Sequence, residues 1–114
     1  MDRSSLEIQV ERRGPNAVVT LRGSAGMVEA EQLRRQLESL SAQQVVITVL
    51  DAGGLEFIGS AGLAAIVHGH LKNRHHGGQI RFVAPPPAVL DVLERTRFTQ
   101  LFSIHSSVQD ALTP

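Results

Sequence analysis

The hydroxyl of Ser60 is the side chain in this sequence whose position best suits chemistry. An apolar run ends at Leu50, a short glycine-rich loop follows over 51–59, and a helical pattern begins at Ser60. At a helix start a serine hydroxyl accepts hydrogen bonds from free backbone N–H groups, and a phosphate is stabilised by the positive end of the helix dipole. The sequence therefore predicts either a capping serine or a phosphorylation switch at this position.

Spacing argues against three other kinds of site. Residues 54–60 have the glycine spacing of a phosphate-binding loop, but that motif needs a lysine before the hydroxyl residue, and here Gly59 adjoins Ser60 directly. Ile58 likewise replaces the first glycine of a hydrolase elbow. Four histidines cluster in the sequence, namely His68, His70, His75 and His76. They do not follow the three- or four-residue spacing that places two metal ligands on one helix face, so we predict no metal site. Because the two other motifs are also incomplete, we predict no catalytic residue and no cofactor.

A long stretch of the chain carries cations without any acid. Between Phe57 and Leu90 there are Lys72, Arg74 and Arg81 but no aspartate or glutamate. This pattern is typical of a solvated helix face, and it is equally compatible with a docking surface for an acidic partner.

Composition sets broad limits on the protein. With 114 residues and 42% hydrophobic content, the chain suits one domain over residues 1–114. Eleven basic residues balance eleven acidic ones, which disfavours nucleic acid as a partner. There is no cysteine, no signal-peptide pattern and no apolar run long enough to span a bilayer. We expect a soluble, cytoplasmic protein without direct membrane insertion.

Alternating apolar patterns predict an α/β fold with a mixed sheet of four to five strands and about four helices. The expected strands are a hairpin at 6–11 and 17–22, a central strand at 45–50, one at 80–84 and a short edge strand within 98–104. The expected helices are centred on 30–40, 60–71, 89–93 and 106–112, the second closed by Gly77 and Gly78 and the last with a serine cap. Sites in such sheets gather at the carboxyl ends of the strands, so the glycine-bearing loops 23–26 and 51–60 should share one edge.

Residues 55–63 read Leu-Glu-Phe-Ile-Gly-Ser-Ala-Gly-Leu and resemble a motif of the STAS domain, in particular of the bacterial anti-sigma-factor antagonists. The family motif is leucine-x-phenylalanine-isoleucine-aspartate-serine-x-glycine-leucine. The resemblance also covers the opening hairpin, the end of the second strand at Gly23, the break at Gly77 and Gly78, and residues 89–98. It implies a STAS-like single domain that binds other proteins and is not an enzyme.

The same resemblance implies a partner and a switch. The partner is an anti-sigma factor that is itself a serine kinase and phosphorylates Ser60 with ATP, and a phosphatase restores the hydroxyl. The unmodified form binds the kinase and frees the sigma factor, so transcription is regulated by partner switching. The implied partner-binding residues are Gly23, Ser24, Ala25, Gly26, Phe57, Ile58, Gly59, Ser60, Ala61 and Gly62.

The sequence departs from the family at two positions near Ser60. The family usually has aspartate at the positions of Gly26 and Gly59. At Gly59 we expect a close backbone contact or a positive φ angle that only glycine accepts readily. There are two alternatives to an antagonist that is switched by phosphorylation. One is a STAS scaffold or transporter accessory subunit that works without phosphorylation, and the other is a sensor of a small ligand or nucleotide.

Overall fold

The computed structural model describes residues 5–114, which form one sheet with helices on both of its faces. The strands are β1 (Leu6–Arg13), β2 (Asn16–Ala25), β3 (Ile47–Ile58), β4 (Gln79–Val83) and β5 (Ser103–His105). The helices are α1 (Met27–Ala42), α2 (Ser60–Arg74), α3 (Pro87–Arg95) and α4 (Val108–Leu112), and a 3₁₀ turn, η1, covers Phe98–Gln100.

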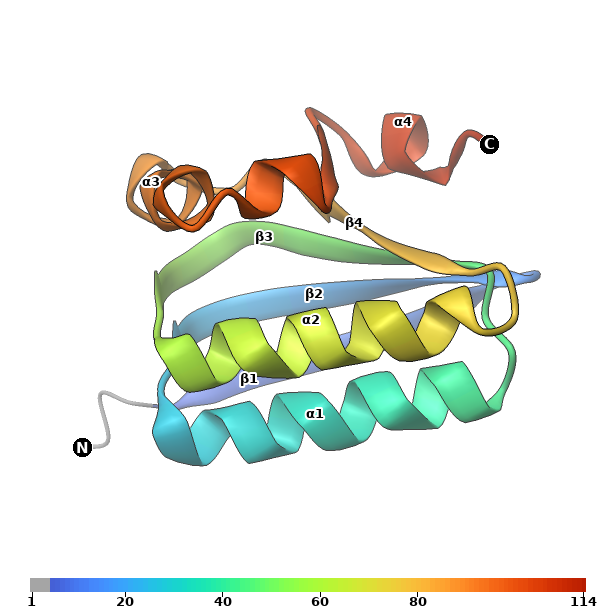
Figure 1. Cartoon of the computed structure of the whole chain (residues 1–114), viewed down its shortest axis with the longest axis horizontal. Helices are drawn as coiled ribbons and strands as arrows, with labels where there is room; N and C mark the ends of the chain where they lie inside the picture. The colour runs from blue at the N-terminus through green and yellow to red at the C-terminus, as the bar shows by residue number, and fades with distance from the viewer. Residues whose placement is uncertain (1–4) are drawn as a thin grey trace.

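The sheet is mixed and its strands lie in chain order. β1 is antiparallel to β2, and the pairs β2–β3, β3–β4 and β4–β5 are parallel. Figure 1 shows α1 and α2 side by side along one face of the sheet and α4 on the other. The predicted α/β fold is confirmed, with five strands and four helices in the described part of the chain.

The opening hairpin forms where period-two alternation predicts it. β1 and β2 pair in a regular register, with Val10 opposite Val19, and the connecting turn contains Gly14 at φ 59°. Glycine suits this turn because a left-handed conformation carries little steric penalty without a Cβ atom.

β3 is the central strand, as its β-branched apolar run predicts. Residues 47–50 are buried, with Val49 packed in a cluster that includes Ala111 of α4, and Leu50 packed in the larger core under α1 and α2. Apolar side chains on both faces explain why this run lacks polar alternation.

α1 and α2 pack closely because small and apolar residues face each other. Leu33 and Leu37 of α1 lie in the same core as Leu63 and Ile66 of α2. Gly69 brings the helices together, since a Cβ atom there would lie 3.2 Å from the Leu37 Cβ. Neither these helices nor any other within residues 5–114 combines the length and apolar character needed to cross a bilayer.

The C-terminal third differs from the prediction in one element. The strand expected within 98–104 is only Ser103–His105, because residues 98–100 form η1. Phe98 and Phe102 pack edge to face with ring centroids 6.2 Å apart, so their spacing follows a helical turn and not a strand. The predicted serine cap of the last helix is confirmed, since Ser107 Oγ accepts a hydrogen bond from the Asp110 N–H at 3.1 Å.

Candidate functional site

Ser60 is the first residue of α2, and its side chain is exposed. The N-cap position belongs to Gly59, which has no side chain to accept a hydrogen bond. The prediction that Ser60 caps the helix is therefore wrong, because the helix already includes this residue. Within residues 5–114 the Ser60 hydroxyl has no hydrogen-bond partner.

The first turn of α2 leaves backbone donors open. Its first helical hydrogen bond runs from the Leu63 N–H to the Gly59 carbonyl at 3.0 Å. In the described part of the chain, the N–H groups of Ser60, Ala61 and Gly62 have no acceptor. Together with the helix dipole, such open donors favour negative charge at this end of α2.

The ends of β2 and β3 converge beside Ser60. Ser24 pairs with Phe57 and Ala25 pairs with Ile58, so the two glycine-bearing segments share one edge as predicted. They are not loops, however, because β2 and β3 continue through them, with register shifts that let the strands stay paired. The Gly59 N–H then donates to the Ala25 carbonyl at 3.0 Å and fixes the start of α2.

The two glycines that replace family aspartates are not required by the backbone. Gly59 has φ −91° and Gly26 has φ −84°, values that any residue adopts, so the expected positive φ at Gly59 is wrong. A Cβ atom at Gly59 would lie 3.4 Å from the Phe57 ring, an ordinary contact. Beside Gly26 a carboxylate already fills the space, because Glu29 Oε1 lies 2.8 Å from where a side chain would begin.

The residues predicted to contact a partner divide by exposure. Phe57 and Ser60 are exposed, with Phe57 at 53%. Ala25, Ile58 and Gly62 are buried and can only position their neighbours. The remaining residues are half-buried, namely Gly23, Ser24, Gly26, Gly59 and Ala61.

Two exposed apolar residues at the same edge were not predicted from the sequence. Met27 and Val28 begin α1 and are 83% and 79% exposed. Val28 lies off the apolar stripe that Ala30 and Leu33 begin, which is the one signal that the sequence offered. Exposed large apolar side chains near a candidate site are typical of a protein-binding surface.

An apolar groove extends from Ser60 along α2. Its walls are α2 and the segment after α3 that carries Thr96 and Phe98. The α2 residues that line it include Leu63, Val67 and Leu71. Ser60 therefore lies at one end of an apolar groove and next to the exposed Phe57.

The profile of the STAS domain matches residues 7–111 of this chain. The chain belongs to the STAS domain family. The fold of this STAS domain resembles the crystal structure of an anti-sigma factor antagonist from Mycobacterium paratuberculosis, with TM-score 0.85, 28% identity, and coverage of 95% of this chain and 92% of that one. A search of curated protein sequences found no match to this chain.

Two structures of SpoIIAA have the same fold. The anti-sigma factor antagonist SpoIIAA in its unphosphorylated form has TM-score 0.83 and 18% identity, with 93% of each chain covered. The Bacillus cell fate determinant SpoIIAA in the phosphorylated form has TM-score 0.75 and 17% identity, with 93% of this chain and 96% of that one covered.

Most cations of the acid-free stretch have local partners in this STAS domain. Lys72 lies 3.4 Å from Glu38 of α1, and Arg81 donates to the carbonyl groups of Ala111 and Thr113 at 3.0 and 2.6 Å. Burial raises the pKa of Glu38, but the Arg34 and Lys72 cations outweigh it and hold this pKa below its ordinary value. Lys72 and Arg81 therefore do not form a broad docking surface for an acidic partner, because both already have partners within the domain.

The clustered histidines have separate environments. His70 is buried, whereas His68 lies 3.5 Å from Glu38 and His76 Nε2 lies 2.8 Å from the Val45 carbonyl. Burial, and then the Arg74 charge, lower the pKa of His70 below its ordinary value. The described residues contain no group of three or more side chains that could hold a metal ion.

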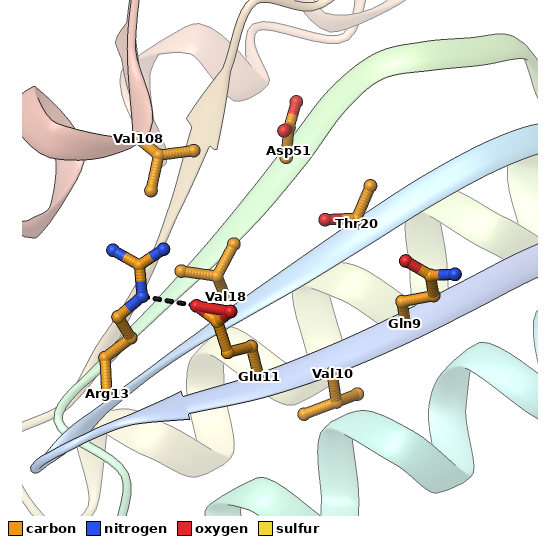
Figure 2. A pocket seen from close by; sticks show the side chains of 8 residues that line it. All are labelled: Gln9, Val10, Glu11, Arg13, Val18, Thr20, Asp51 and Val108. Atoms are coloured by element: carbon orange, nitrogen blue, oxygen red, sulfur yellow. Dashed lines mark hydrogen bonds and ion pairs between the residues drawn. The ribbon is translucent and has the colours of Figure 1, made fainter.

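A second groove lies on the face of the sheet that carries α4 (Figure 2). Its charged groups are engaged locally, since Glu11 and Arg13 form an ion pair and Asp51 Oδ1 accepts a hydrogen bond from the Gly53 N–H at 3.3 Å. Figure 2 also shows Thr20 on β2 between Asp51 and Gln9. This groove therefore has mixed polarity, and its charged side chains already have partners within the domain.

Proposed function

We propose that this STAS domain is an anti-sigma factor antagonist that binds an anti-sigma factor through the edge around Ser60. The observation that carries the proposal is an exposed serine on the uncapped first turn of α2, next to the converged ends of β2 and β3. The relatives described as anti-sigma factor antagonists support the identity of the partner. The domain would act in the cytoplasm by binding another protein and not as an enzyme. Through this binding it would regulate transcription by partner switching.

The proposed contact surface combines apolar and open polar groups. Phe57, Met27 and Val28 supply exposed apolar area, and the groove along α2 extends it. Buried aromatic anchors dominate the affinity of many protein interfaces, so Phe57 is the proposed anchor. The buried Gly62 keeps the helix close to β2, because a Cβ atom there would lie 3.1 Å from the Ala25 carbonyl.

The proposed release signal is phosphorylation of Ser60. The anti-sigma factor, acting as a kinase, transfers the γ-phosphoryl group of ATP to Ser60 Oγ, ADP leaves, and a phosphatase later hydrolyses the ester. The phosphoryl group adds about −1.5 to −2 charges, which the open N–H groups at the start of α2 and the helix dipole stabilise. Its charge and bulk would then lie where the partner packs against Phe57.

The test is the intact mass of the protein after incubation with an anti-sigma factor kinase and ATP. We expect the mass of one phosphoryl group in the wild type and in Ser24→Ala, a matched variant that removes a neighbouring serine at this edge. We expect no added mass in Ser60→Ala. A phosphoryl group that persists in Ser60→Ala would contradict the proposed switch.

Glycine at positions 26 and 59 favours a second candidate function. Without the two acids that the family places near the serine, the domain would be a scaffold that binds its partner without phosphorylation. Affinity for the partner distinguishes the two functions. Binding that is unchanged in Ser60→Glu supports the scaffold, and loss of binding supports the switch.

A further inference from the structure

Another groove lies at the C-terminal end of α2. His70 and Arg74 of α2 line it, together with Gln79 at the start of β4 and Gln100 in η1. Arg74 ends the helix that Ser60 begins, about 21 Å away along the helix axis. The groove is therefore separate from the proposed partner surface.

The ring of His70 is held in one tautomer. Its side chain is only 5% exposed, and Nδ1 accepts a hydrogen bond from the Ile80 N–H at 3.0 Å. A ring nitrogen that accepts a hydrogen bond carries no proton, so the proton of the neutral ring lies on Nε2. Within residues 5–114 this Nε2–H has no acceptor, and His70 is one of the residues that line the groove.

Arg74 supplies a cation beside the same groove. It lies four residues after His70, so the two side chains share one face of α2. Among the described residues Arg74 has no ion-pair partner, and none of the groove residues is acidic. In the described structure Arg74 donates to none of the last carbonyl groups of α2, and the oxygens of Lys72, Asn73 and Arg74 accept from the N–H groups of residues 75–78.

We infer that this groove binds a small oxyanion, a phosphate or a carboxylate, between the Arg74 guanidinium and the Nε2–H of His70. The planar guanidinium donates two parallel hydrogen bonds to such a group. A donor in a low-dielectric environment also forms a stronger hydrogen bond than it would in water. The side-chain amides of Gln79 and Gln100 line the same groove and can donate to the remaining oxygens.

The test is a titration of the ¹⁵N-labelled full chain with inorganic phosphate, at constant ionic strength so that general screening does not change. We expect saturable shifts of the His70 Nε2 resonance and of the Ile80 amide. Arg74→Gln removes the exposed cation without disturbing the core and should weaken binding about tenfold. Shifts that rise linearly without saturation would overturn the inference.

Lys72→Gln is the matched control, because it removes one positive charge from the same helix but not from this groove. It should leave the affinity for phosphate unchanged, and equal losses in Lys72→Gln and Arg74→Gln would also overturn the site. A parallel titration with acetate separates the two ligand chemistries. Tighter binding of phosphate indicates a free or esterified phosphate, and tighter binding of acetate indicates a carboxylate.

Discussion

The two ends of α2 are finished in opposite ways. At the N-terminal end, Gly59 offers no capping side chain, and the first three N–H groups of the helix have no acceptor in the described structure. At the C-terminal end, the N–H groups of residues 75–78 donate hydrogen bonds to the last carbonyl oxygens of the helix, and Gly77 adopts φ 82°. One helix therefore has a closed end that holds the chain in place and an open end that is available for a partner or a phosphoryl group.

The side chains around the two ends differ in the same sense. The open end exposes the apolar Phe57 beside the neutral Ser60. The closed end exposes a cation, Arg74, beside the buried His70. This difference supports the proposed protein-binding surface at one end of α2 and the proposed site for a small anion at the other.

The largest expected effect is on stability, when a methyl group is added to Gly23 at the open end. Gly23 has φ 101°, and a Cβ atom would lie 2.4 Å from the backbone oxygen of Ser5. We expect Gly23→Ala to lower the free energy of unfolding by about 3 kcal/mol, from backbone strain together with the clash. Denaturant unfolding measures this loss.

Gly77→Ala at the closed end is the control for that prediction. Gly77 also has a positive φ, but a Cβ atom there would meet nothing within 4 Å. It should lose about 1 kcal/mol, from conformation alone. Equal losses in both variants would show that the close approach of β2 to residue 5 does not stabilise the edge.

The next effect is on partner binding. Replacement of the half-exposed Phe57 by serine should weaken binding to the anti-sigma factor by about 2 kcal/mol, because an aromatic anchor is lost, while the fold changes little. Calorimetric titration provides the affinity. Val46→Ser removes an apolar side chain of 41% exposure next to the closed end and should bind normally. Normal binding by Phe57→Ser would place the partner elsewhere.

A smaller gain in stability is expected when the missing acid is restored at the open end. The extended backbone of Gly59, with ψ 178°, suits an N-cap aspartate, whose carboxylate would accept hydrogen bonds from the free N–H groups. Gly59→Asp should therefore raise the free energy of unfolding by about 0.5 kcal/mol, from the cap and from the charge at the helix dipole. If thermal denaturation shows no stabilisation, the first turn of α2 is not open as described.

The smallest effect concerns pH at the closed end. Because the pKa of His70 is lowered on folding, the unfolded chain binds a proton more readily than the folded one. Its contribution to stability is complete above the ordinary histidine pKa of about 6.5 and declines as the pH falls below that value. We expect His70→Gln to lose less stability than the wild type between about pH 8 and pH 5. Identical pH profiles would contradict a neutral, buried ring.

The fold could be predicted from the sequence where local patterns determine it. The stripe of Ala30, Leu33 and Leu37 specifies a buried helix face, and the β-branched run before Asp51 specifies the central strand. The extension of β3 through Gly53 and Gly54 could not be predicted in this way, because it depends on distant backbone partners in β2 and on a shifted register.

The candidate site was predictable in position but not in detail. Ser60 was expected at a helix start, but the choice of Gly59 as the N-cap depends on a tertiary hydrogen bond to the Ala25 carbonyl. The role of His70 was equally out of reach, because its partner is the backbone N–H of Ile80 in another element. Periodicity placed both residues on α2, and only the fold shows what each one contacts.

The central claim is that modification of one exposed hydroxyl at the open end of α2 controls partner binding. The most direct test is the affinity of the anti-sigma factor for unmodified protein and for protein phosphorylated at Ser60, measured by calorimetry under the same conditions. We predict that phosphorylation weakens binding about a hundredfold or more, because the phosphoryl group puts charge and bulk where the partner packs against Phe57, and burying added charge in an interface costs several kcal/mol. Equal affinity for the two forms would contradict the account.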